Sequence, residues 1–187
     1  MHHIEPFWNW RDYYVAEDDI NSPFYQNSYS EIYFSNTIYN YYIHPQWDFF
    51  GSRTLYLKIL FADYDLGYCI IEFIGEWNDC LYNDIMYLKR DVVEWLVEKG
   101  ITKFILIGEN VLNFHYSDDD YYQEWFEDID QGWIVGLGFL EHVVREFRKA
   151  HLNNYIQFED DENWIEWRIL KPQDLFLLIE QNYFEKK

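Results

Sequence analysis

The chain has few basic residues and no long apolar run, and these shortages exclude two classes of partner. Its 14 Lys and Arg residues stand against 34 Asp and Glu residues, which gives a formal net charge of −20 in 187 residues. DNA-binding proteins take much of their affinity from Lys and Arg that neutralise phosphates. Anionic membrane surfaces attract basic segments in the same way. We therefore expect neither nucleic acid nor a membrane as a partner.

Other shortages bear on the cellular compartment. The longest strongly apolar stretch, residues 133–140, contains two glycines, and it is shorter than the about 20 residues that span a bilayer. Residues 1–5 lack the basic region and apolar run that begin a secretion signal. Because no secretion signal is seen, the only two cysteines, Cys69 and Cys80, are expected to be reduced thiols. They also lack the spacing of zinc ligands. We expect a cytoplasmic protein.

The sequence also lacks the signatures of familiar catalytic and nucleotide sites. It contains no phosphate-binding loop, no dinucleotide-binding glycine motif between a strand and a helix, and no nucleophile elbow. It is instead 22% aromatic, with 9 Trp, 18 Tyr and 15 Phe. Disordered charged chains are poor in aromatic residues, because they cannot bury enough apolar surface. We therefore expect one folded domain with its acidic residues outside.

The first 50 residues differ from the rest, because they contain three prolines and little helical periodicity. We expect residues 1–50 to form an aromatic-rich extension that packs on an α/β domain of residues 51–187. Within the extension, residues 37–43 alternate in a pattern typical of an aromatic strand. Aromatic rings usually bury their area, so a wrap over the core is the first interpretation. The alternative is an exposed platform for a carbohydrate, formed by Tyr39, Tyr41 and Trp47.

From residue 54 onward the pattern predicts alternating strands and helices. Residues 54–62 and 68–74 are β-rich and flank a short turn that ends in Gly, as in an antiparallel hairpin. A helix is expected from residue 79 or 83 to 99, because its apolar residues recur at three- and four-residue steps. A buried strand at 101–107 then completes a β-α-β unit with parallel strands.

The second half of the chain continues this alternation. Helices are expected near 118–129 and 139–151, while residues 132–138 fit either a strand or the first turns of a helix. A second hairpin is expected from 155–158 and 164–170, with its polar tip at 159–163, and Pro172 opens a last helix. The fold class is therefore α/β, with α+β as the alternative. We predict a single domain with a mixed β-sheet, β-hairpins and a β-α-β core packed by three to four helices.

The order of these elements loosely resembles that of a known family. From residue 54 to about 150, the succession of hairpin, helix, strand and helix resembles the STAS domain, the fold of bacterial anti-sigma-factor antagonists. Residues 111–114, Val-Leu-Asn-Phe, are similar to a hydrophobic stretch near the corresponding place in that family. The family's Asp-Ser-Ser/Ala-Gly phosphorylation motif should follow, but residues 115–118 read His-Tyr-Ser-Asp. The resemblance therefore concerns topology and carries over no functional residue.

One group of residues could carry chemistry: Glu109, His115, Asp118, Asp120 and Glu124. They follow the buried strand, and ligands in open α/β sheets bind beyond the carboxyl ends of strands. Carboxylates with one imidazole suit a divalent cation, as in a metal-binding protein or a metal-dependent enzyme. The alternative is that the acids cap the next helix and favour its dipole.

The leading hypothesis for function is a non-enzymatic interaction or regulatory domain with an acidic surface. A basic protein surface is the natural partner for such charge. No cofactor is expected under this hypothesis, whereas the metal hypothesis requires a divalent cation. The carbohydrate-binding hypothesis requires the aromatic platform, and the sequence carries no signal of an oligomeric state.

Overall fold

The core of the molecule is a five-stranded mixed β-sheet. A computed structural model describes residues 3–30, 32–159 and 164–184. The strands, in their order across the sheet, are β3 (Leu55–Asp63), β4 (Tyr68–Asn78), β5 (Lys103–His115), β6 (Trp133–Leu137) and β7 (Gln157–Phe158). β3 and β4 pair antiparallel, and the other neighbours pair parallel. The predicted α/β class with a mixed sheet in a single domain is confirmed.

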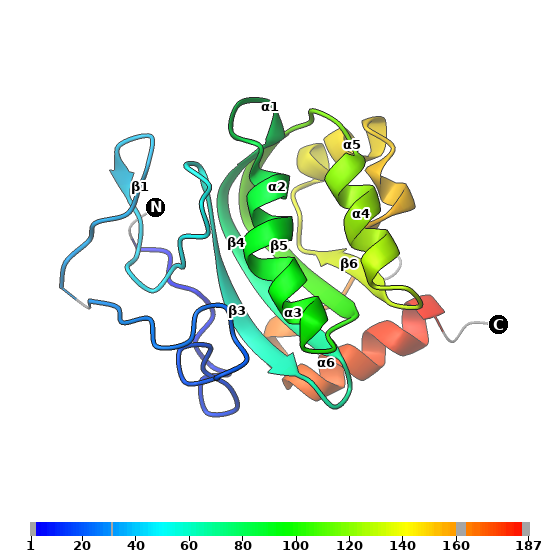
Figure 1. The fold of residues 1–187 in the computed structure, drawn as a ribbon, viewed down its shortest axis with the longest axis horizontal. Helices are drawn as coiled ribbons and strands as arrows, with labels where there is room; N and C mark the ends of the chain where they lie inside the picture. Colours follow the sequence, from blue (N-terminus) through cyan, green and yellow to red (C-terminus); the bar gives the residue numbers. More distant parts are fainter. Residues whose placement is uncertain (1–2, 31, 160–163, 185–187) are drawn as a thin grey trace.

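Helices cover both faces of the sheet, because its central strands are apolar on both sides. One face carries α1 (Asp79–Tyr82), α2 (Asp84–Leu88), the π-helical turn η1 (Lys89–Val93), α3 (Glu94–Glu98), α4 (Asp120–Asp128) and α5 (Glu141–Lys149) (Figure 1). The other face carries η3 (Trp167–Ile169), α6 (Pro172–Ile179) and η4 (Glu180–Phe184), while the short helix η2 (Leu152–Asn154) follows α5. No helix in the described part of the chain is both long and apolar enough to cross a membrane.

Adjacent residues of the central strands enter different apolar cores. Ile71 and Leu106 belong to the cluster beneath the helical layer of α2 to α5. Their neighbours Ile70 and Ile105 belong to the cluster beneath α6. This division follows from the two-residue period of a strand, which sends successive side chains to opposite faces. The predicted continuous apolar strand therefore fills two cores at once.

The β3–β4 hairpin is confirmed, but the helix and strand after it depart from their predicted bounds. The helix is interrupted at Asn83, which adopts the left-handed conformation (φ 53°) and separates α1 from α2. β5 does not end at residue 107; it continues to His115, which pairs with Asn78 at the end of β4. Residues 109–115 therefore lie in a strand rather than in a loop beyond it. The partner strand, not the local sequence, fixes this length.

The second half of the chain resolves one open alternative and corrects one prediction. Residues 133–137 form strand β6, and Pro172 opens α6 as predicted. The prediction of a second hairpin is wrong, because β7 pairs parallel with β6 and residues 167–169 form a 3₁₀-helix. Ile169 is 79% exposed, so burial does not alternate as it would in a strand. Of the predicted tip, residues 160–163 lie outside the described residues.

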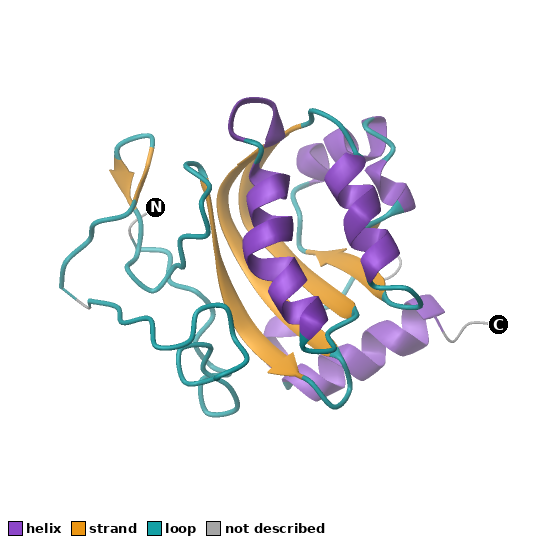
Figure 2. Cartoon of the chain, viewed as in Figure 1, coloured by secondary structure: helices purple, strands orange, loops and turns teal. Residues whose placement is uncertain are grey.

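The N-terminal segment, residues 3–30 and 32–50, is mostly coil and lies beside the edge strand β3 (Figure 2). Asp48 and Leu57 exchange backbone hydrogen bonds of 2.7 and 3.2 Å across this edge. The predicted strand at 37–43 is instead a tight hairpin of β1 (Thr37–Ile38) and β2 (Tyr41–Tyr42). Tyr39 and Asn40 have positive φ angles of 48° and 68°, and these angles reverse the chain.

Candidate functional site

The structure does not bring the five predicted site residues together. Glu109 lies on β5 and faces the layer of α6, where its carboxylate accepts a hydrogen bond of 2.7 Å from the indole of Trp167. The guanidinium of Arg168 forms an ion pair with the same carboxylate. Glu109 therefore holds η3 against the sheet. A cation site that used it would first have to break these two contacts.

The other predicted residues lie near the start of α4. His115 ends β5 and is exposed, Asp118 accepts a hydrogen bond of 3.0 Å from the hydroxyl of Ser117, and Asp120 is the exposed first residue of α4. Within residues 3–30, 32–159 and 164–184, no group of three or more His, Cys, Asp or Glu side chains is arranged to hold a metal ion.

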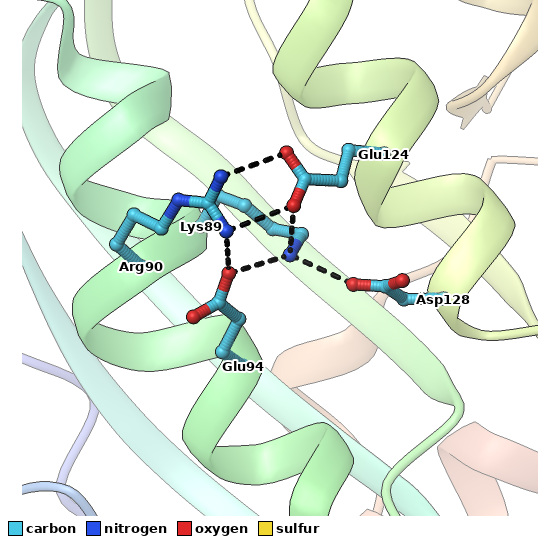
Figure 3. Close-up of polar contacts among 5 residues, drawn as sticks. All are labelled: Lys89, Arg90, Glu94, Glu124 and Asp128. Carbon is cyan, nitrogen blue, oxygen red and sulfur yellow. Dashed lines mark hydrogen bonds and ion pairs between the residues drawn. The ribbon is translucent and has the colours of Figure 1, made fainter.

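Glu124 belongs to an ion-pair network between two helical elements (Figure 3). The side chain of Lys89, on η1, is fully buried, and its ammonium lies 2.8 Å from Asp128, 3.1 Å from Glu94 and 3.5 Å from Glu124. Arg90 adds ion pairs to Glu94 and Glu124. Burial disfavours the charged form of Lys89, but its hydrogen bonds to Asp128 and Glu94 outweigh burial and raise its pKa.

The network explains how α4 is held in place. Lys89 opens the π-helical turn η1, a rare geometry that is frequent at functional sites. Its ammonium meets two carboxylates of α4, Glu124 and Asp128, and one of α3, Glu94. A buried cation is tolerated only when it is paired, so the three carboxylates compensate the charge that the fold buries at Lys89. They leave the outer face of α4 in a fixed orientation.

Beside the network, the start of α4 and the residues around it form an exposed surface that is both aromatic and acidic. The rings of Tyr116 and Phe126 are 37% and 38% exposed. Phe126 and Tyr155 have ring centroids 5.9 Å apart, and the hydroxyl of Tyr155 donates a hydrogen bond of 3.0 Å to Asp119. We call this surface the α4 surface and define it by Tyr116, Asp118, Asp119, Asp120, Phe126, Glu127 and Tyr155.

The charge of the α4 surface is not balanced locally. Residues 118–130 contain seven Asp and Glu residues and no Lys or Arg. Lys89 and Arg90 neutralise the inner carboxylates, whereas Asp118, Asp120 and Glu127 form no ion pair with any basic residue that the structure describes. Partial burial, followed by the charges of the neighbouring aspartates, raises the pKa of Tyr116. The surface therefore offers ring faces within a field of negative charge.

The three residues of the predicted carbohydrate platform do not share one exposed surface. Tyr39 and Tyr41 are 51% and 67% exposed on the β1–β2 hairpin, and the hydroxyl of Tyr39 donates a hydrogen bond of 2.7 Å to Glu76. Trp47 is fully buried, and its indole donates a hydrogen bond of 2.8 Å to the carbonyl of Ile4. The platform must therefore be corrected, because Trp47 stabilises the N-terminal segment from within.

Two features of the site region were not found from the sequence. Lys89 sits in the predicted helix next to its apolar stripe, and nothing in the pattern distinguishes it from a solvated lysine. Asp79 resembles an ordinary helix-capping residue, yet it is 3% exposed and accepts a 2.7 Å hydrogen bond from Tyr122. Burial raises the pKa of Asp79 to about 7. The only sequence signal for either residue is a charged side chain beside apolar neighbours.

Comparisons with known proteins give a partial likeness at the level of the fold. No family model matches the chain, and no curated protein matches it. One solved structure, of the anti-sigma factor antagonist SpoIIAA in its unphosphorylated form, is 11% identical, with a TM-score of 0.42 over 57% of this chain and 90% of that chain. Another, of the Bacillus cell fate determinant SpoIIAA in the phosphorylated form, is 10% identical, with a TM-score of 0.37 over 57% and 93%. These values assign neither a family nor a function to this chain.

Proposed function

We propose that the chain is a protein-interaction domain that binds a basic segment of a partner protein at the α4 surface. The observation that carries the proposal is the exposure of Tyr116 and Phe126 among carboxylates that the chain does not neutralise. Arg and Lys side chains match both features, because they pair with carboxylates and stack on aromatic faces. A basic segment would therefore gain two kinds of contact on one surface.

The support of α4 from beneath favours this function. Lys89 and Arg90 tie the helix to η1 and α3 through Glu124 and Asp128. A surface that is already ordered loses less conformational entropy when a partner binds. The net charge of −20 adds long-range attraction, which speeds the encounter with basic partners. The domain would act on its partner by covering the partner's basic segment, and this mode of action suits a regulatory role.

The test measures the affinity of the domain for a fluorescein-labelled peptide rich in Arg and Lys by fluorescence anisotropy. Asp118→Asn together with Asp120→Asn removes two charges from the α4 surface. The matched control, Asp12→Asn with Asp174→Asn, removes the same charge from exposed positions elsewhere. We expect the α4 pair to weaken binding about tenfold and the control pair less than about twofold, because exposed charge contacts contribute up to about 1 kcal/mol each.

The aromatic contribution is tested separately with Phe126→Ala. Leu177→Ala is its control, because Leu177 is 52% exposed on α6 and lies outside the α4 surface. We expect only Phe126→Ala to weaken binding, and to do so at high salt as well, where charge attraction is screened. Equal losses in both charge-changed pairs would show that the peptide senses net charge alone, and the proposal would then be rejected.

A further inference from the structure

A second surface, on the N-terminal segment, is hollowed into a groove of about 550 Å³. The aromatic residues Tyr29, Tyr33 and Phe49 line it above the buried Trp47, together with amides and hydroxyls that include Asn27 and Asn36. Tyr33 is 78% exposed and Phe49 54% exposed, so both rings are open to solvent. The N-terminal segment lies beside the edge strand β3, whereas α4 lies toward the opposite edge of the sheet (Figure 1). The groove is therefore distinct from the α4 surface.

The groove exposes almost no charge although the chain is strongly acidic. Its one charged lining residue among those the structure describes is Asp48, which is 1% exposed. The ammonium of Lys58 lies 3.3 Å from Oδ2 of Asp48 and 4.2 Å from the ring centroid of Tyr29. Oδ1 of Asp48 accepts hydrogen bonds from the hydroxyl of Tyr29 and the amide of Asn27. Lys58 also pairs with Glu17 at 3.1 Å, so the two carboxylates share one ammonium. The buried carboxylate of Asp48 is nevertheless enclosed by its own partners and presents no open face to a second cation.

We propose that this groove binds a neutral saccharide. A lining that exposes almost no charge gives a charged ligand no partner, and the groove's Tyr, Ser and Asn side chains combine flat rings with adaptable hydrogen-bonding groups. The ring faces of Tyr33 and Phe49 can pack against the C–H faces of a sugar ring, while the amides and hydroxyls bond its hydroxyl groups. The volume falls within the range of about 300–1,000 Å³ that small-molecule sites occupy.

Of the predicted carbohydrate platform only the buried Trp47 borders the groove, so the carbohydrate hypothesis now rests on other exposed residues. Tyr39 and Tyr41 project from the β1–β2 hairpin and do not line the groove, whereas Tyr33, Asn36 and Phe49 do. A basic segment is the less suitable occupant here, because Lys58 already pairs with the one carboxylate of the lining. The saccharide proposal is therefore independent of the function proposed for the α4 surface.

The experiment is native gel electrophoresis of the full chain through gels that contain one soluble neutral polysaccharide each: mixed-linkage β-glucan, xyloglucan, galactomannan or soluble starch. The high negative charge gives fast migration, so binding appears as retardation. Calorimetry with a hexasaccharide of the retarding polymer then gives the affinity. We expect Tyr33→Ala and Asn36→Ala each to weaken it about tenfold, the loss expected from one well-packed contact.

Tyr41→Ala is the matched control, because Tyr41 is 67% exposed and lies outside the groove. We expect this variant, and the Asp118→Asn and Asp120→Asn pair, to bind the hexasaccharide as the unmodified chain does. Thermal melting shows whether each variant is folded. Because Tyr33 is exposed, we expect Tyr33→Ala to have little effect on the fold. Absence of retardation by all four polymers would overturn the proposal. Loss of binding in Tyr41→Ala but not in Tyr33→Ala would overturn it too, in favour of the hairpin.

Discussion

Replacing the buried Asp79 with Asn should remove a large part of the dependence of stability on pH. Asp79 is 3% exposed at the start of α1. Its carboxylate accepts hydrogen bonds from the indole of Trp77, the amide of Ile85 and the hydroxyl of Tyr122, at 3.2, 2.9 and 2.7 Å. These bonds favour the ionised form, but burial outweighs them and raises the pKa of Asp79 to about 7.

The sign and size of the effect follow from proton linkage. An unfolded chain releases this proton near the ordinary pKa of 3.8, whereas the folded chain keeps it up to about pH 7. Between these values the folded state binds more protons, so the free energy of unfolding falls as pH rises. At about 1.4 kcal/mol per pH unit over about three units, ionised Asp79 lowers stability at pH 8 by on the order of 4 kcal/mol relative to pH 3.

The assay is urea denaturation of the unmodified chain and of Asp79→Asn at several pH values between about 4 and 8. Asn preserves the shape of the side chain without the titrating proton, so the two proteins should be similar near pH 4 and Asp79→Asn more stable at pH 8. Glu72, whose pKa burial also raises to about 7, titrates in both proteins and cancels in the difference.

Two results would refute this reasoning about Asp79. Parallel stability curves for the unmodified chain and Asp79→Asn would mean that the carboxyl group titrates alike in the folded and unfolded states. A variant that is less stable than the unmodified chain at pH 8 would mean that the lost hydrogen bonds outweigh the removal of a buried charge. The first result would mean that burial does not determine the protonation of Asp79, and the second that its hydrogen bonds contribute more to stability than its buried charge costs.

The remaining predictions concern the network, one glycine and metal ions. Lys89→Met should lower the free energy of unfolding by about 1–2 kcal/mol, because Asp128 loses its cation while Arg90 still pairs with Glu94 and Glu124, and all three carboxylates are partly exposed; Arg90→Gln, at an exposed pair, should cost less in the same denaturation assay. Gly75→Ala should be strongly destabilising in thermal melting, since Gly75 has φ +118° and a Cβ there would lie 2.0 Å from the carbonyl oxygen of Thr54. Mg²⁺, Mn²⁺, Ca²⁺ and Zn²⁺ should each raise the melting temperature of EDTA-treated protein slightly and equally, with no change in Asp120→Ala; a rise selective for one ion and lost in that variant would instead support the metal site.

Features that depend on neighbouring residues in the chain could be predicted from the sequence. The β3–β4 hairpin was predicted because its turn and both alternating strands lie within one continuous stretch. Helices α5 and α6 follow from a local apolar period and, for α6, from Pro172 in the first turn. Each of these signals reports a preference that the rest of the molecule does not oppose.

The limits of β5 and the candidate site could not be predicted, because residues far apart in the sequence decide them. β5 continues past Gly108 because the end of β4 supplies pairing partners as far as Asn78. Within this strand Glu109 turns toward Trp167, 58 residues away, and so leaves the cluster of acids near α4. Proximity in the sequence thus suggested a cation site, whereas the face of the strand determines which residues can meet.

The ion pairs within the fold make the two proposed binding surfaces more different from each other. Lys58 pairs with both Glu17 and the buried Asp48, so the lining of the groove exposes almost no charge and suits an uncharged ligand. Lys89 pairs with the inner carboxylates of α4, Glu124 and Asp128, whereas Asp118 and Asp120 on the exposed side form no ion pair with a basic residue that the structure describes. Because the surfaces lie apart and differ in charge, a basic partner and a saccharide should bind without competition. Calorimetric titration of the hexasaccharide into protein saturated with the basic peptide tests this, and a lowered affinity would mean that the surfaces are coupled.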